Sequence, residues 1–261
     1  MENGNQVISI KNLSIGYSEK IVLENISIDI DQNDVVAILG LNGTGKSTLL
    51  RTMSGLQPSI KGEIFINGKS LTKYSATDVS KQIGIVLSGR AEVMPLLTVV
   101  EILSLARTPY TDIFHKLSDE DKVLIENTLS ELNIIHLKNR KIYQLSDGEA
   151  QKVFIAKAIV QQTSIILMDE PTSHLDIHNK IEIFSLIKQL GKQNKTIVFA
   201  SHELDLAIQV ADKFFLIDKD GTFVFGKMDS LIQGDKFALF FDSASFKFNK
   251  HTGKFETRFF T

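Results

Sequence analysis

A glycine-rich stretch at residues 40–48 constrains the fold of this chain more than any other feature. It reads Gly40-Leu41-Asn42-Gly43-Thr44-Gly45-Lys46-Ser47-Thr48, the pattern of glycine, four residues, glycine, lysine, and serine or threonine. The apolar run at 35–39 before it is typical of a strand buried on both faces of a parallel sheet. Helical spacing of apolar residues follows and ends at Gly55, a predicted C′ glycine. Strand, loop and helix in this order predict a site for the phosphates of a nucleoside triphosphate.

Each residue type in this loop has a physical task in such a site. The glycines allow backbone N–H groups to converge on phosphate oxygens, and the helix N-terminus places partial positive charge behind them. We expect Lys46 to reach the β- and γ-phosphates and the Ser47 hydroxyl to ligate Mg²⁺. The loop residues expected to contact the nucleotide are Gly40, Asn42, Gly43, Gly45, Lys46, Ser47 and Thr48.

The remaining hydrophobic patterns predict an α/β fold. Apolar strands alternate with helices across 164–217, as in a parallel sheet. Alternating patterns at 7–15 and 21–30 predict an antiparallel β subdomain, and helical spacing predicts a helical insertion at about 98–160. We expect one domain over 1–230. The aromatic extension at 231–261 is expected to form a hairpin, packed on the domain in preference to a partner. Its packing residues would be Phe246, Phe248, Phe255 and Phe259.

Composition excludes several classes of function. The chain has no cysteine, which rules out disulfides and thiolate-ligated zinc or iron–sulfur centres. A net charge of −2 gives no overall basic field for holding nucleic acid. No apolar run approaches the roughly 18 residues that span a bilayer. Any membrane role is therefore expected to come through partners.

A pair of carboxylates ends the apolar run at 164–168. Open α/β sheets place ligand chemistry at the carboxyl ends of their strands, so Asp169 and Glu170 are candidate site residues. Asp169 can hold Mg²⁺, directly or through water, while Glu170 polarises the attacking water.

Further motifs follow in a fixed order. Leu145-Ser146-Asp147-Gly148-Glu149 precedes a predicted helix, and Ser173-His174-Leu175-Asp176 follows the two carboxylates. These two stretches resemble the signature peptide and the D-loop of the ATP-binding cassette (ABC) family. Tyr17 resembles that family's adenine-stacking aromatic, residues 166–170 its Walker B strand and His202 its switch histidine. The resemblance extends to about residue 230.

The resemblance implies a P-loop NTPase of the ABC ATPase type that works in pairs. Such domains pair head to tail and enclose two ATP molecules between the phosphate loop of one and the signature peptide of the other. In that arrangement Tyr17 would stack on adenine, while Ser146 and Gly148 would complete the γ-phosphate cage from the opposite subunit. Lys46, Glu170 and His202 would be the catalytic residues, with His202 contacting the γ-phosphate.

Two residues depart from the family pattern. Ser88 replaces the glutamine that normally helps to place Mg²⁺ and water, and we expect its shorter side chain to act through an extra water. Asp147 replaces the first signature glycine. Because a carboxylate near a triphosphate is unfavourable, we expect Asp147 to face solvent or a basic residue.

The resemblance also implies partners. The expected function is that of the ATPase subunit of an ABC transporter at the cytoplasmic face of the inner or plasma membrane. It would work as a homodimer or paralogue dimer beneath separate transmembrane permease subunits, with a solute-binding protein acting indirectly. Residues 105–110 resemble those of importers of iron–siderophores, haem or vitamin B12. An alternative is a soluble ABC ATPase that supports iron–sulfur cluster assembly.

Overall fold

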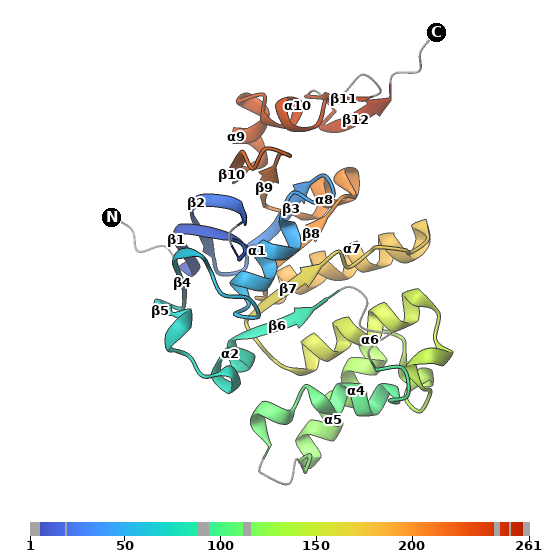
Figure 1. Ribbon diagram of the computed structural model, residues 1–261. Helices are drawn as coiled ribbons and strands as arrows, with labels where there is room; N and C mark the ends of the chain where they lie inside the picture. Colours follow the sequence, from blue (N-terminus) through green and yellow to red (C-terminus); the bar gives the residue numbers. More distant parts are fainter. Residues whose placement is uncertain are drawn as a thin grey trace.

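The computed structural model describes residues 6–18, 20–87, 94–111, 116–242, 246–250 and 252–257. Within these ranges the strands form two sheets and a C-terminal hairpin (Figure 1). None of the helices in these ranges is long and apolar enough to cross a membrane.

The N-terminal sheet is antiparallel and has the strand order β2-β1-β4-β5. Burial alternates over the second half of β2, as its sequence pattern predicts, whereas β1, which pairs on both sides and has irregular register, is buried in longer runs. Asn67 and Gly68 have φ values of 49° and 76°, and these two residues with positive φ make the tight turn between β4 and β5. The strands are β1 (Gln6–Tyr17), β2 (Lys20–Asp31), β4 (Lys61–Ile66) and β5 (Lys69–Ser70).

The second sheet carries the predicted parallel strands. Its described part has the order β10-β9-β3-β8-β7-β6, with only the β9–β10 pair antiparallel. Leu39 pairs with Ser201, and Asp169 pairs with Ala200, so three carboxyl ends share one edge. The strands are β10 (Phe223–Lys227), β9 (Lys213–Ile217), β3 (Val35–Gly40), β8 (Thr196–Ser201), β7 (Ile165–Asp169) and β6 (Ile83–Val86).

Helix α1 (Lys46–Met53) lies between the two sheets (Figure 1). Leu49, Leu50 and Met53 join one hydrophobic core with both sheets. Gly55 has φ 75°, and its N–H donates to Thr52 O while the Leu56 N–H donates to Arg51 O. This Schellman pattern confirms the predicted C′ glycine.

The helical region lies on the opposite side of the six-stranded sheet from α1 (Figure 1). It contains α4 (Val99–Leu105), α5 (Asp119–Glu131) and α6 (Asp147–Val160), joined by short 3₁₀ turns. Ser118 caps α5 as the sequence predicts, because its side chain accepts a hydrogen bond from the Asp121 N–H. Another short helix, α2 (Ala76–Gln82), leads into β6.

The remaining helices flank the sheet and its C-terminal end. They are α7 (Ile177–Lys192), α8 (Leu204–Val210), α9 (Met228–Gln233) and α10 (Lys236–Phe241). After them, β11 (Phe246–Asn249) and β12 (Lys254–Thr257) pair as a hairpin. Phe248 is 2% exposed and stacks on Phe237 with ring centroids 5.0 Å apart. The hairpin expected over 231–261 is confined to its second half, since α9 and α10 occupy the first. The Phe259 residue and the Phe246 side chain lie outside what the structure describes.

Candidate functional site

A cleft of about 720 Å³ opens at the carboxyl edge of the six-stranded sheet. Its walls come from the turn between β1 and β2, the loop before α1, the end of β7 and the residue after β8. The predicted site residues that line it are Tyr17, Asn42, Gly43, Gly45, Lys46, Ser47, Thr48, Glu170 and His202. Lys20 and Val22 line it too and were missed. Lys20 pairs with Tyr17 across the β1–β2 ladder, so the strand register could have indicated it.

The glycine loop is shaped by positive φ angles. Gly43 and Gly45 have φ values of 82° and 102°, which only glycine adopts readily. A Cβ on Gly45 would also lie 2.5 Å from Val22 Cγ1, so glycine is required sterically as well. The Thr44 hydroxyl donates to Leu41 O at 2.9 Å and tightens the loop. Backbone N–H groups in such a loop can bind phosphate oxygens.

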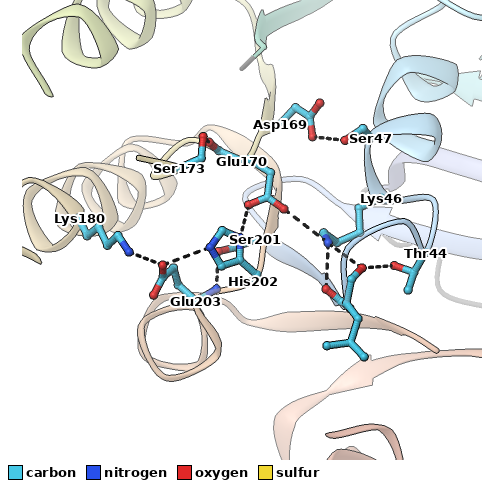
Figure 2. Close-up of polar contacts among 12 residues, drawn as sticks. Thr44, Lys46, Ser47, Asp169, Glu170, Ser173, Lys180, Ser201, His202 and Glu203 are labelled. Atoms are coloured by element: carbon cyan, nitrogen blue, oxygen red, sulfur yellow. Dashed lines mark hydrogen bonds and ion pairs between the residues drawn. The ribbon is translucent and has the colours of Figure 1, made fainter. Parts of the chain in front are cut away.

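Lys46 is folded back onto this loop. Its side chain is only 5% exposed, and Nζ donates to Gly40 O at 2.9 Å and to Leu41 O at 3.1 Å. Nζ also lies 3.4 Å from Glu170 Oε1 (Figure 2). Each of these partners is an oxygen acceptor, so phosphate oxygens can replace them with little change in the chemistry around the ammonium group.

A hard-oxygen donor set lies beside the lysine. Ser47 Oγ donates to Asp169 Oδ1 at 2.7 Å, and Asp169 is 2% exposed (Figure 2). Burial raises the pKa of the Asp169 carboxyl; the Ser47 hydrogen bond opposes this shift, and the charge of Glu170 adds to it. A bound cation would remove the cost of ionising this buried group. A hydroxyl and a carboxylate are ligands that Mg²⁺ accepts, so these residues fit the metal.

Glu170 has an unusual backbone for a non-glycine residue, with φ 49°. Such a conformation costs about 1–3 kcal/mol and occurs most often at functional sites. Ala200 O accepts a hydrogen bond from the Glu170 N–H at 3.2 Å, and the Ser173 N–H donates to Glu170 O at 3.2 Å. These bonds hold the carboxylate between Lys46 and His202, whose Nδ1 lies 2.7 Å from Glu170 Oε2.

Tyr17 stands at the mouth of the cleft and is 54% exposed. Its hydroxyl oxygen lies 3.1 Å from Thr48 Oγ1, which ties it to helix α1. The strand patterns at 7–15 and 21–30 leave Tyr17 between the two predicted strands, but it is the last residue of β1, because strand pairing with Lys20 continues to that point. The exposed ring can stack on a planar base.

The signature residues do not line the cleft of their own chain. Ser146 caps α6 and is exposed, and its Oγ accepts a hydrogen bond from the Glu149 N–H at 3.3 Å. Gly148 is buried under the Asn179 side chain, which a Cβ at this position would meet. Asp147 is exposed, as expected. Ser88 lies outside the described residues, one position beyond the described chain that follows β6.

The phosphate loop, the buried carboxylate and the parallel sheet define a P-loop nucleotide-binding protein. Comparison with known proteins is more specific: the ABC transporter family model matches residues 23–173. The iron(3+)-hydroxamate import ATP-binding protein FhuC of Bacillus subtilis is 36% identical over 218 residues, covering 83% of this chain and 80% of that protein.

Solved structures give the same result. A metal-chelate type ABC transporter in an inward-facing conformation matches with a TM-score of 0.78 and 30% identity, covering 90% of this chain and 88% of that chain. The dimeric bacterial cassette MJ0796 matches with a TM-score of 0.73 and 29% identity, covering 85% of this chain and 98% of that chain. This chain belongs to the ABC transporter family. It is an ATP-binding subunit, and ATP-binding subunits of this family are ATPases.

Proposed function

We propose that the chain hydrolyses ATP in a head-to-tail dimer and thereby drives import of a metal chelate through separate permease subunits. The observation that carries the proposed hydrolysis is the placement of Glu170. Its carboxylate lies between the phosphate-loop lysine and His202, at the carboxyl edge of the sheet. A base in that position can accept a proton from water that attacks a γ-phosphate held by Lys46.

The other residues divide the remaining tasks. Lys46 would exchange its carbonyl partners for the β- and γ-phosphates. Ser47 and Asp169 would hold Mg²⁺, which when bound neutralises phosphate charge. His202 would hydrogen-bond to the γ-phosphate, and Tyr17 would stack on adenine. Ser88, named from the sequence as a third contributor to the metal site, remains a prediction.

A second copy is needed to complete the cage. Ser146 and Gly148 lie outside their own cleft, at the N-terminus of α6, where backbone N–H groups and the helix dipole favour an anion. In a head-to-tail dimer, each copy would present this helix end to the ATP of the other. The match to a dimeric cassette supports this arrangement.

The cargo is inferred from relatives. FhuC of Bacillus subtilis is named for iron(3+)-hydroxamate import, and the achromobactin transport ATP-binding protein CbrD of Dickeya dadantii is 31% identical to this chain. We infer a metal chelate as cargo and membrane permease subunits as partners. The chain would then be peripheral, at the cytoplasmic face of the membrane, with a solute-binding protein acting indirectly.

A membrane pull-down with Glu170→Gln tests the proposal. This variant lacks the proton acceptor but keeps the phosphate site, so with ATP we expect a stable closed dimer and ATP turnover reduced at least about 10²-fold. The captured complex should contain a polytopic membrane protein, with wild type as the control. Recovery of soluble scaffold proteins alone would contradict the transporter function and favour cluster assembly. Undiminished turnover would contradict the role of Glu170.

A further inference from the structure

The imidazole of His202 has a second carboxylate beside it. Nε2 lies 3.4 Å from Glu203 Oε1, while Nδ1 lies 2.7 Å from Glu170 Oε2 (Figure 2). Glu203 is not among the residues that line the cleft. Its carboxylate therefore contacts His202 from outside the proposed phosphate site.

Glu203 is itself held in place by contacts of both its side chain and its backbone. Lys180 of α7 forms an ion pair with its carboxylate, and the two side chains are only 21% and 23% exposed. The Glu203 N–H donates to Ser201 Oγ at 3.0 Å, and Ser201 is fully buried. The Glu203 carbonyl accepts the Ala207 N–H at 3.0 Å in the first turn of α8. An ion pair this shielded loses less to solvent screening than a surface pair.

The backbone of Lys180, the ion-pair partner of Glu203, is also held in place. Lys180 lies in the first turn of α7, where its N–H donates to Asp176 O at 2.9 Å. Five side chains therefore form one line across the site, with a lysine at each end and the imidazole between two carboxylates. In order they are Lys46, Glu170, His202, Glu203 and Lys180 (Figure 2).

These contacts affect the orientation of the His202 imidazole ring. The His202 side chain is 47% exposed, so packing alone leaves its two side-chain torsions freedom to rotate. Nδ1 is hydrogen-bonded to Glu170 Oε2, whereas the contact of Nε2 with Glu203 Oε1 is electrostatic and attracts the ring when both of its nitrogens carry protons. A carboxylate fixed at Nε2 keeps the Nδ1 edge directed at Glu170.

We propose that Glu203, held by Lys180, is a positioning residue for His202 that keeps the Nδ1 edge of the ring on the side of the phosphate site. The inference rests on the role proposed above for His202 in hydrolysis. Because Glu203 and Lys180 do not line the cleft, they act on turnover and leave ATP affinity unaffected.

Single-turnover and steady-state kinetics of the full chain test the proposal. Glu203→Gln keeps the shape of the side chain but removes its charge and its ion pair. It is expected to lower kcat about tenfold, within the range of coupling between residues in contact, with KM for ATP unchanged. Lys180→Met removes the other charge of this ion pair and should also lower kcat. In a His202→Ala background, Glu203→Gln should have no further effect.

Glu182→Gln is the matched control. Like Lys180, Glu182 lies on α7, and like Glu203 it lies outside the cleft lining, but its ion pair is with Lys152 of α6 and not with a residue that contacts His202. This variant should leave both kcat and the His202 ring unchanged. An equal loss in Glu182→Gln and Glu203→Gln would mean that any broken ion pair on α7 has this effect, and the proposal would be overturned.

Nitrogen NMR of the histidine rings in the nucleotide-free chain tests the contact directly. The His202 signals are assigned by their loss in His202→Ala. Glu203→Gln should shift the Nε2 signal of His202 and leave the signals of the other histidines unchanged. Unchanged ring signals, or loss of turnover by Glu203→Gln equally with and without His202, would overturn the positioning role. If His202→Ala hydrolyses ATP at the wild-type rate, the proposed role of His202 fails and the positioning role fails with it. If His202→Ala loses turnover and Glu203→Gln does not, only the positioning role is overturned.

Discussion

Lys46 is buried among oxygen acceptors of its own chain. Its Nζ contacts Gly40 O, Leu41 O and Glu170 Oε1, so the ammonium group is already desolvated before phosphate arrives. In the proposed ATP complex, phosphate oxygens would replace these partners and form stronger charge-assisted hydrogen bonds with the Lys46 ammonium group.

Replacing Lys46 with methionine should therefore weaken ATP binding. Hydrogen bonds to charged groups contribute about 1.5–3 kcal/mol each, so the loss should be at least about tenfold. Titration with a fluorescent ATP analogue measures this loss of affinity. Lys61→Met, at an exposed lysine that begins β4, is the control and should bind as wild type. Equal affinity in Lys46→Met and wild type would contradict the proposed phosphate contact.

The sequence predicts this part of the site well because each residue type corresponds to one local requirement. Gly43 and Gly45 supply positive φ, and Asp169 comes at the end of an all-buried strand. The contact of Glu203 with Lys180 was not predictable, because Lys180 lies in α7 and Glu203 precedes α8, and surface charges are common in any helical sequence. Only the packing of α7 beside α8 brings them together.

At the scale of secondary-structure elements, a buried ion pair joins the three helices of the helical region to one another. Arg107 Nε donates to Asp121 Oδ1 at 2.6 Å, and Arg107 Nη1 donates to Val160 O at 3.0 Å. Both charged residues are 8% exposed. The sequence indicates the cap of α5 at Ser118, but it does not reveal that Asp121 also serves Arg107, because their approach depends on how α4 and α5 pack on α6.

Asp121→Asn is expected to lower the free energy of unfolding by about 3 kcal/mol at neutral pH, because it leaves the Arg107 charge buried without its partner. Burial opposes ionisation of Asp121, but hydrogen bonds from the Ser118 N–H and Arg107 outweigh it, so the pKa of Asp121 lies below its ordinary 3.8. A lowered pKa contributes stability that is present above pH 3.8 and is lost as the pH falls through the native value.

Urea unfolding over a pH series measures both effects. The difference between wild type and Asp121→Asn should narrow as the pH falls below 3.8. Asp119→Asn is the control on the same helix, since Asp119 is 91% exposed and its ion pair with Lys122 lies at the surface. A difference that stays constant with pH, or an equal loss in the control, would contradict the buried-pair account.

At the scale of the whole molecule, the six-stranded sheet separates two hydrophobic cores. One core includes α1 and the antiparallel sheet, and the other includes the helical region and the C-terminal segment. Phe237, Phe240 and Phe241 belong to the second core. Their i, i+3, i+4 spacing was the helical signal for α10. We expected only a hairpin there, because the dense aromatic residues on both sides of the turn favour a strand pair as strongly as a helix.

The predicted site residues are divided between the cleft and the N-terminus of α6, so in our account a second copy of the chain is required to complete the site. The cleft contains Lys46, Glu170 and His202, whereas Ser146 and Gly148 lie outside it. Our central claim is that a second copy of the chain brings its signature residues to this cleft when ATP is bound. The dimer should therefore depend on both ATP and the N-terminus of α6.

Sedimentation velocity of Glu170→Gln, with and without ATP, tests this claim most directly. We predict a monomer without ATP and a dimer with saturating ATP and Mg²⁺. The double variant Glu170→Gln/Ser146→Arg should still bind ATP yet remain monomeric, because the arginine side chain blocks the opposing phosphate site. A Glu170→Gln chain that stays monomeric with ATP, or a double variant that dimerises equally well, would contradict the account.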